Sequence, residues 1–211
     1  LCSIAHAKTG ENSLAMAGGV VLNCVANGRI AKESPFEKTF FLPSAGDDGT
    51  AMGAALYVSH CIHGQKRRWD IPTTDYLGLA FSEDEMEREL IKAGVAYQRC
   101  ENPSTQAAEA LANGQIIGWF QGAAELGPRA LGNRSILADP RNPEMKDTLN
   151  ARVKFREGFR PFAPSCLEEA VGELFDSDHP SPFMLRVYNT LPERRKDLAS
   201  VTHVDGGARV Q

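Results

Sequence analysis

The segment 118–164 places the strongest constraint on how this 211-residue chain can fold. It carries eight basic residues against five acidic ones, a local net charge of +3 in a chain whose total is −4. Glycine and proline recur between the bases, and Gly158 and Pro161 disfavour a continuous helix there. We therefore expect loops that hold arginine forks in fixed directions, as binding of a compact anion such as phosphate requires.

The same bases also have a purely structural interpretation. Arginines in loops rich in glycine and proline often cap helix ends or pair with nearby acids. Arg141 with Asp139 and Arg156 with Glu157 are close enough in sequence to do only that. From the residues alone, both interpretations stay open.

Composition narrows the possible partners and the compartment. A net charge of −4 and a pI near 5.8 argue against a broad nucleic-acid surface. The five dispersed cysteines include no CxxC pair, which favours reduced thiols over disulfides or structural zinc. No apolar run approaches the roughly 20 residues that span a bilayer, and there is no signal peptide. We expect a cytoplasmic protein with neither nucleic acid nor membrane as partner; its oligomeric state is unknown.

Short-range patterns indicate a mixed α/β chain. Strands are expected at 14–17 and 38–42, each followed by a helix, at 20–31 and 47–63, and this alternation is typical of an α/β layer. Ser82 and Glu85 form a predicted capping box, and Asn102-Pro103 begins a further helix. The remaining expectations are strands at 95–99 and 116–120 (the latter buried), helices at 143–152 and 167–175, and extended chain at 153–156, 183–187 and 201–209.

Two further motifs have functional and structural interpretations of similar weight. Gly18-Gly19 before a helix lets backbone N–H groups approach a phosphate, but a glycine pair also simply closes a tight connection. Asp47-Asp48 precedes a helix, where one aspartate as N-cap contributes about 1 kcal/mol and the second is left over.

Four segments resemble the O-carbamoyltransferases that make nodulation factors, cephamycins and aminoglycosides. They are GWFQGAAELGPRALGNRSILADPR, KFREGFRPFAPS, AGGVVLNCVANGRI and HVDGGARVQ. The resemblance covers most of the chain and is weakest across 64–113. It implies that residues 1–66 end an actin/Hsp70-type ATPase-fold domain, that 67–95 form a connector, and that 96–211 form a YrdC-like α/β domain with a twisted sheet. Leu1 is not a start methionine, so we expect a fragment, truncated at its C-terminus and inactive alone for transfer.

The resemblance also implies a reaction and a site. The enzyme would use carbamoyl phosphate and ATP, through carbamoyl-adenylate, to carbamoylate a hydroxyl of a small-molecule or glycan acceptor. Asp47 would ligate an iron-type divalent metal whose HxxxH histidines are missing here, and Mg would accompany ATP. Gly18, Gly19 and Asn23 would contact nucleotide, Asn27 more weakly. The bases expected at the phosphates are Arg129, Arg134, Lys154, Arg156 and Arg160.

Several points stay open at this stage. One alternative is a non-catalytic nucleotide- or phosphate-binding fragment, which the missing HxxxH keeps open. A YrdC-type enzyme making threonylcarbamoyl-adenylate for tRNA is the other alternative, which the negative net charge disfavours. Glu125 is expected to pair with an arginine rather than to hold magnesium. His203, Asp205 and Arg209 alternate along an expected strand, with structural pairing and substrate contact equally open.

Overall fold

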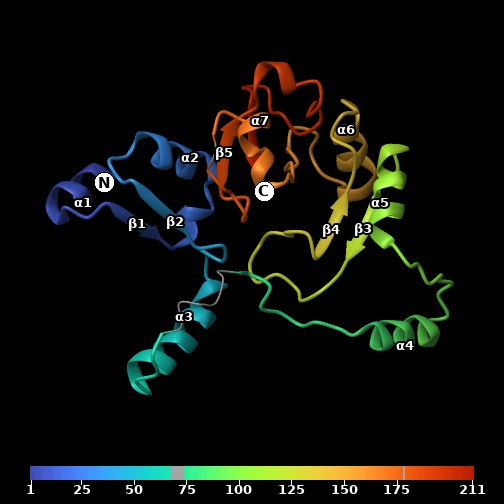
Figure 1. Ribbon diagram of the computed structural model, residues 1–211, viewed down its shortest axis with the longest axis horizontal. Helices are drawn as coiled ribbons and strands as arrows, with labels where there is room; N and C mark the ends of the chain where they lie inside the picture. The colour runs from blue at the N-terminus through green and yellow to red at the C-terminus, as the bar shows by residue number, and fades with distance from the viewer. Residues whose placement is uncertain (68–73, 178) are drawn as a thin grey trace.

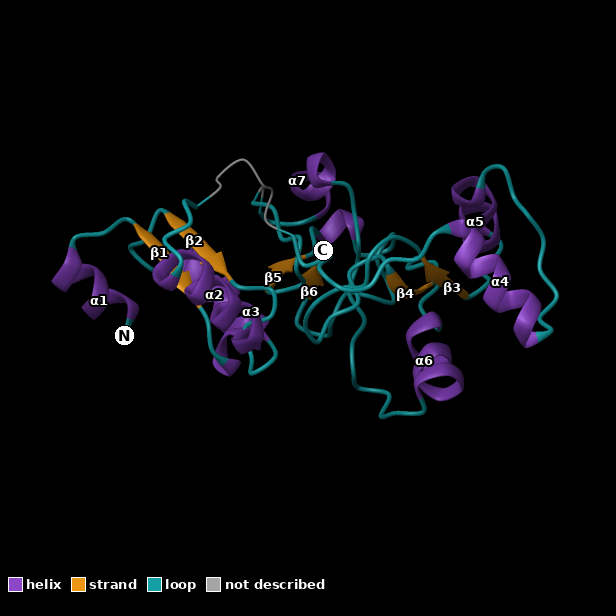
Figure 2. Ribbon diagram, turned by 90° about the horizontal axis from the view of Figure 1, so that it is seen from below, coloured by secondary structure: helices purple, strands orange, loops and turns teal. Residues whose placement is uncertain are grey.

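The computed structural model describes residues 1–67, 74–177 and 179–211, and these residues form short helices and three two-stranded sheets. The elements lie in three groups along the long axis (Figures 1 and 2). The first part of the chain lies at one end, β3, β4, α4 and α5 lie at the other, and β5, β6 and α7 lie between them. The mixed α/β class expected from the sequence is therefore observed. The expected connector falls partly on 68–73, outside the described residues.

The first group confirms the two strand–loop–helix units. Its elements are α1 (Cys2–Thr9), β1 (Ser13–Met16), α2 (Cys24–Glu33), β2 (Lys38–Phe41) and α3 (Gly49–Tyr57). The two strands pair in parallel, and α2 supplies the crossover that a parallel pair requires. The helix predicted at 20–31 is α2, and it begins later than predicted because a 3₁₀ turn (Gly19–Leu22) precedes it. Asn23 then caps α2 by accepting a bond from the Ala26 N–H (3.0 Å).

The second group contains the arginine-rich segment. Its elements are α4 (Glu83–Ala93), α5 (Pro103–Ala112), β3 (Ile117–Phe120), β4 (Arg134–Leu137) and α6 (Met145–Leu149). β3 and β4 pair antiparallel, and the chain between them forms the loops that carry Arg129. The strand predicted at 116–120 exists but is not buried, since Phe120 is 52% exposed.

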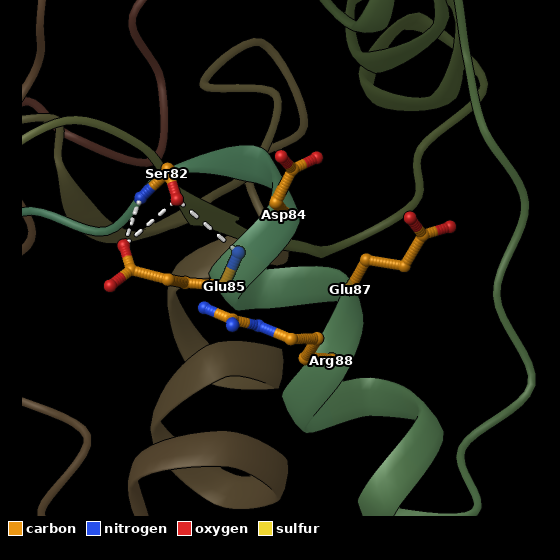
Figure 3. Close-up of a pocket in the computed structure, with 5 residues that line it drawn as sticks. All are labelled: Ser82, Asp84, Glu85, Glu87 and Arg88. Carbon is orange, nitrogen blue, oxygen red and sulfur yellow. Dashed lines mark hydrogen bonds between the residues drawn. The ribbon is translucent and has the colours of Figure 1, made fainter.

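The capping box predicted at the start of α4 is confirmed (Figure 3). The Ser82 hydroxyl accepts a bond from the Glu85 N–H (3.3 Å), and the Glu85 carboxylate accepts one from the Ser82 N–H (2.8 Å). The open depression beside it holds about 560 Å³ and is lined only by residues 82–88. Figure 3 shows Asp84 and Glu87 directed away from the cap, as on a solvated acidic helix. We assign this helix no function.

The predicted strand at 95–99 is wrong. In the structure these residues have no regular conformation and lie beside α4, where Tyr97 and Arg99 both bind the carboxylate of Glu87. A strand needs a partner for its ladder, and none of the described residues pairs with this segment.

Lys154 and Arg156 would share a face only if 153–156 were extended, and in the structure this segment is not. α6 continues as a π-helical turn (Asn150–Lys154) and ends at Phe155, which adopts a left-handed conformation with φ of 47°. Lys154 therefore belongs to a helical turn and Arg156 follows a sharp reversal. The two side chains do not share a strand face.

The C-terminal group consists of α7 (Val171–Leu174), β5 (Arg186–Asn189) and β6 (Gly207–Val210). The extended segments predicted at 183–187 and 201–209 are only partly correct, because both strands are short. Residues 203–206 form a turn instead, in which Gly206 has φ of 88° and the Asp205 carboxylate accepts a bond from the Gly207 N–H (2.9 Å). Aspartate and glycine favour such turns over strand.

One core cluster joins segments that are far apart in sequence. Val21, Phe41 and Ala45 pack with Leu185, which immediately precedes β5. α2 lies against β5 across this cluster, and the Asn27 amide donates to the carbonyls of Val21 (2.7 Å) and Leu185 (2.9 Å). This packing brings the start of α2 close to β6, the partner of β5.

Candidate anion site

Three arginines from distant segments converge beside the start of α2. Arg129 lies in the loop between β3 and β4, Arg156 follows the π-helical turn, and Arg209 lies on β6. Burial, and then the charges of Arg129 and Arg156, lower the pKa of Arg209 below its ordinary value. Within the part of the chain that the structure describes, no carboxylate forms an ion pair with any of the three. The cluster therefore concentrates positive charge, and Glu157 acts on Arg156 only through its electrostatic field.

Two of these guanidinium groups have unused donors. The Nε atoms of Arg129 and Arg209 are buried and have no hydrogen-bond partner among the described residues. Arg129 makes only a long bond from Nη2 to the carbonyl of Leu22 (3.4 Å). A buried donor left unpaired costs about 1–3 kcal/mol, so such groups usually face a ligand or water. The oxygens of a phosphate are the acceptors that these forks fit best.

Arg156 is held in place by a buried asparagine. Its Nε donates to Asn150 Oδ1 (2.7 Å), and its guanidinium lies 4.7 Å from the centre of the Phe162 ring. Asn150 is 1% exposed and also donates to the carbonyl of Arg160 (3.0 Å). Sequence reasoning missed this residue; its signal is an asparagine directly after the apolar residue Leu149, where a helix that buries one face comes to its end.

The start of α2 forms one wall of the site. Leu22 accepts the bond from Arg129, and Cys24 is close enough to interact electrostatically with Arg209. The predicted nucleotide contacts Gly18, Gly19 and Asn23 lead into this wall, but none of them contacts the three arginines through any bond between described residues. Gly18 has φ of 105° and open space where a side chain would lie, while the Asn23 side chain is occupied as the cap of α2.

The other three predicted bases are not brought to the cluster. Arg134 donates to the carbonyls of Gln121 (2.5 Å) and Gly122 (3.2 Å) and lies 3.6 Å above the Phe120 ring. Arg160 pairs with Glu157 (2.9 Å), and Lys154 is exposed. Their predicted contact with phosphate stays a prediction.

Of the two ion pairs considered from the sequence, the structure contains one, Arg141 with Asp139. Arg141 does pair with Asp139, through Nε and Oδ1 at 2.9 Å, and so has a structural partner. Glu157 pairs with Arg160 instead of Arg156, which leaves Arg156 with the cluster. His203 lies 3.1 Å from Asp205 in the exposed turn before β6. Arg209 alone of that motif reaches the site, which sequence reasoning left open.

The expected contact of Asn27 with nucleotide is not supported by its position. This residue is 1% exposed, and its amide is used to join α2 to the chain before β5. It is a packing residue and does not face the site with Asn23. Asn23, in contrast, is the N-cap of α2, where its side chain accepts a bond from the Ala26 N–H.

The expectation that Glu125 pairs with an arginine is wrong. Glu125 pairs with no arginine among the described residues; its Oε1 accepts bonds from the N–H groups of Leu131 (2.8 Å), Asn133 (2.8 Å) and Arg134 (3.2 Å). Burial acts to raise the pKa of Glu125, but these backbone bonds outweigh it and the pKa lies below its usual value. The carboxylate thereby closes the loop that carries Arg129.

Replacing Glu125 with glutamine is expected to lower the free energy of unfolding by about 2 kcal/mol at pH 7, because charge-assisted bonds are replaced by neutral ones. A depressed carboxylate pKa stabilises the fold above the unfolded pKa, and this contribution is lost as the pH falls through the folded pKa. The difference between wild type and Glu125→Gln should therefore shrink in acid. Urea unfolding from pH 3 to 8 measures it, with exposed Glu144→Gln as control; equal differences at all pH values contradict the prediction.

The described residues do not assemble a metal site around Asp47. Asp47 is exposed, and its carbonyl accepts bonds from the N–H and hydroxyl of Thr50. Asp48 occupies the N-cap position of α3 without a side-chain bond. Among the described residues, no group of three or more His, Cys, Asp or Glu side chains is placed to hold a metal ion. Asp47 would offer a metal only a single carboxylate, so we derive no step through a metal here.

None of the described helices is both long and apolar enough to cross a bilayer.

Comparisons with known proteins agree along the chain. A family model described as "Carbamoyltransferase N-terminus" matches residues 1–56, and one described as "Carbamoyltransferase C-terminus" matches residues 108–211. The chain is 47% identical over 209 residues to nodulation protein NolNO of Sinorhizobium fredii, covering 96% of this chain and 31% of that protein. It is 44% identical over 213 residues to nodulation protein NolO of Bradyrhizobium diazoefficiens, covering 98% and 39%. An uncharacterised protein of Synechocystis is 42% identical over 233 residues, covering 98% and 38%. The chain thus spans about a third of the length of these relatives.

Proposed function

The chain belongs to the carbamoyltransferase family, and from this premise we propose that the protein is an O-carbamoyltransferase. It uses carbamoyl phosphate and ATP, forms a carbamoyl-adenylate, and transfers the carbamoyl group to a hydroxyl of a small molecule or glycan. The observation that carries the proposal is the convergence of Arg129, Arg156 and Arg209 without a carboxylate partner, two of them with buried free donors.

The arginine cluster binds and orients the phosphate groups. Arginine remains protonated at any physiological pH, so these side chains act as fixed charges and not as proton donors. Water cleaves carbamoyl phosphate into carbamate and phosphate. A carbamate oxygen then attacks the α-phosphate of ATP, so that pyrophosphate leaves and negative charge builds up on its oxygens. Guanidinium groups already in place stabilise that charge without having to reorganise. Each charged bond contributes roughly 1.5–3 kcal/mol, so a few of them suffice for micromolar binding.

The finer assignments belong to the same proposal. Residues 1–66 form the tail of an ATPase-fold domain and 96–211 a YrdC-like domain, in a cytoplasmic protein. Gly18, Gly19 and Asn23 contact nucleotide, Asp47 joins an iron-type metal site, and Mg accompanies ATP. These assignments are supported by the matched motifs. The contact between Arg129 and Leu22 supports a site formed by both matched parts of the chain.

A second candidate is a phosphate-binding module without catalysis. It is favoured by the lack of a metal-binding group among the residues that the structure describes. Such a module binds carbamoyl phosphate or ATP through the same arginines and converts neither.

The experiment that tests the proposal is release of pyrophosphate from ATP by the full-length protein, with and without carbamoyl phosphate. We expect release that depends on carbamoyl phosphate, because the carbamate formed from it displaces pyrophosphate from the α-phosphate. Calorimetric titration with each ligand is measured alongside. Binding without any release supports the module, and absence of both binding and release contradicts both candidates.

A further inference from the structure

A short segment before α4 lies against the loop that carries Arg129. We call residues 74–79 the strap. The Gly78 N–H donates to the carbonyl of Ala124 (2.9 Å), and the Ala124 N–H donates to the carbonyl of Leu79 (2.9 Å). A Cβ on Gly78 would lie 2.9 Å from Ala124, so the two backbones are in close contact. The strap is therefore bonded to the chain that leads into the anion site.

The strap holds the arginine loop at both of its ends. At the start of the loop, the Leu126 N–H donates to the carbonyl of Asp75 (2.6 Å). At its end, the Tyr76 hydroxyl donates to the carbonyl of Leu131 (2.8 Å). Arg129 lies between these two anchors. Any shift of the strap changes where its guanidinium points.

The Asp75 side chain is buried beside a second carboxylate. It is 3% exposed, and its Oδ2 has no hydrogen-bond partner. Burial, and then the charge of Glu125, raise the pKa of Asp75. Among the described residues, Glu125 and Tyr76 are the ionisable groups that interact with it, and no cation does. A buried carboxylate that no cation neutralises and that a second negative charge repels favours its protonated form, and one proton between Asp75 and Glu125 removes the repulsion.

We propose that Asp75 is a positioning residue of the anion site, whose protonated carboxyl group donates a hydrogen bond to Glu125 and thereby holds the strap against the Arg129 loop. Glu125 is free to accept this bond, since only its Oε1 receives the three backbone N–H groups. Loss of the Asp75 proton replaces the bond by repulsion and loosens the loop. The role in anion binding rests on the proposed function; the strap contact itself does not.

The direction of the pH dependence follows from the raised pKa of Asp75. Above the unfolded value of about 3.9, the folded chain keeps a proton that the unfolded chain has lost. The stabilisation is therefore complete below that value and is lost as the pH rises through the folded pKa of Asp75. The pKa of Glu125 is shifted in the opposite direction, so its contribution to stability is lost in acid. Variants at the two positions are therefore expected to have opposite pH dependences.

The test is hydrogen exchange of residues 126–134 in the full-length protein from pH 5 to 9, expressed as protection factors. In the wild type we expect protection to fall roughly tenfold as the pH rises, as loss of one hydrogen bond to a charged group implies. Asp75→Asn donates an N–H at every pH, so its protection should stay nearly constant. Asp75→Ala should be unprotected throughout, and exposed Asp84→Asn should match the wild type. The affinity for carbamoyl phosphate should follow the same four profiles.

Three results overturn the inference. Protection in the wild type that does not change with pH excludes a shared proton. Asp75→Asn that is unprotected at low pH, where the wild type is protected, excludes a hydrogen-bonding role. This comparison with the wild type still decides if Asp75→Ala fails to fold. Protection that rises with Mg²⁺ in the wild type but not in Asp75→Asn indicates a cation in place of the proton. A wild type that binds no carbamoyl phosphate overturns the proposed function, while the exchange data still judge the strap.

Discussion

Replacing both Arg129 and Arg209 with alanine is expected to weaken carbamoyl phosphate binding on the order of 1,000-fold, because each lost charged bond costs roughly 2 kcal/mol. These two side chains have buried Nε donors that no described group accepts, so their removal should cost affinity while breaking only the long bond from Arg129 to Leu22. Each single alanine variant should lose about 30-fold. Arg209→Lys should recover only part, because an ammonium keeps the charge but lacks the planar fork.

Calorimetric titration of the full-length protein measures this effect. The matched control removes two other arginines, Arg29 and Arg141, whose guanidiniums are exposed and already paired with Glu33 and Asp139. The control changes the net charge by the same amount, so it separates a local site from the general field. A double variant at Arg129 and Arg209 that binds as tightly as this control would mean that the arginines only support the loops.

Features with a local physical cause were predictable from the sequence. The capping box at Ser82 and the Asn102-Pro103 helix start depend on bonds between residues three apart, and both are observed. The parallel pair β1 and β2 follows from two strand–helix alternations. Arg129 and Arg156 were identified from the arginine-rich pattern and its resemblance to carbamoyltransferases, and the structure places both near Arg209.

The remaining features depend on contacts between distant segments, which no local pattern contains. Arg209 reaches the site only because β5 packs on α2, and so its neighbours in sequence give no signal. Glu125 was expected to meet an arginine, but backbone N–H groups of its own loop satisfy it first. The expected strand at 95–99 formed no ladder because no described strand lies beside it.

The contact between α2 and β5 gives the second large effect. Gly28→Ala is expected to lower the free energy of unfolding by about 3 kcal/mol. A Cβ at this position would lie 2.6 Å from the carbonyl oxygen of Val187 in β5, and backbone cannot move aside as a side chain can. α2 would have to separate from β5, which also strains the bond from Asn27 to Leu185. Alanine's better helix propensity, about 1 kcal/mol, opposes this only in part.

The control for Gly28→Ala is Gly53→Ala, since Gly53 also lies in a helix, α3, but has nothing within 4 Å of its Cβ position. That variant should raise stability by about 1 kcal/mol, so the two substitutions have opposite signs in urea unfolding. Because α2 forms a wall of the anion site through Leu22 and Cys24, Gly28→Ala should also weaken carbamoyl phosphate binding and Gly53→Ala should not. Equal stability of the two variants would show that α2 and β5 are not in contact in solution. The arginine cluster would then lose the packing that brings Arg209 to Arg129.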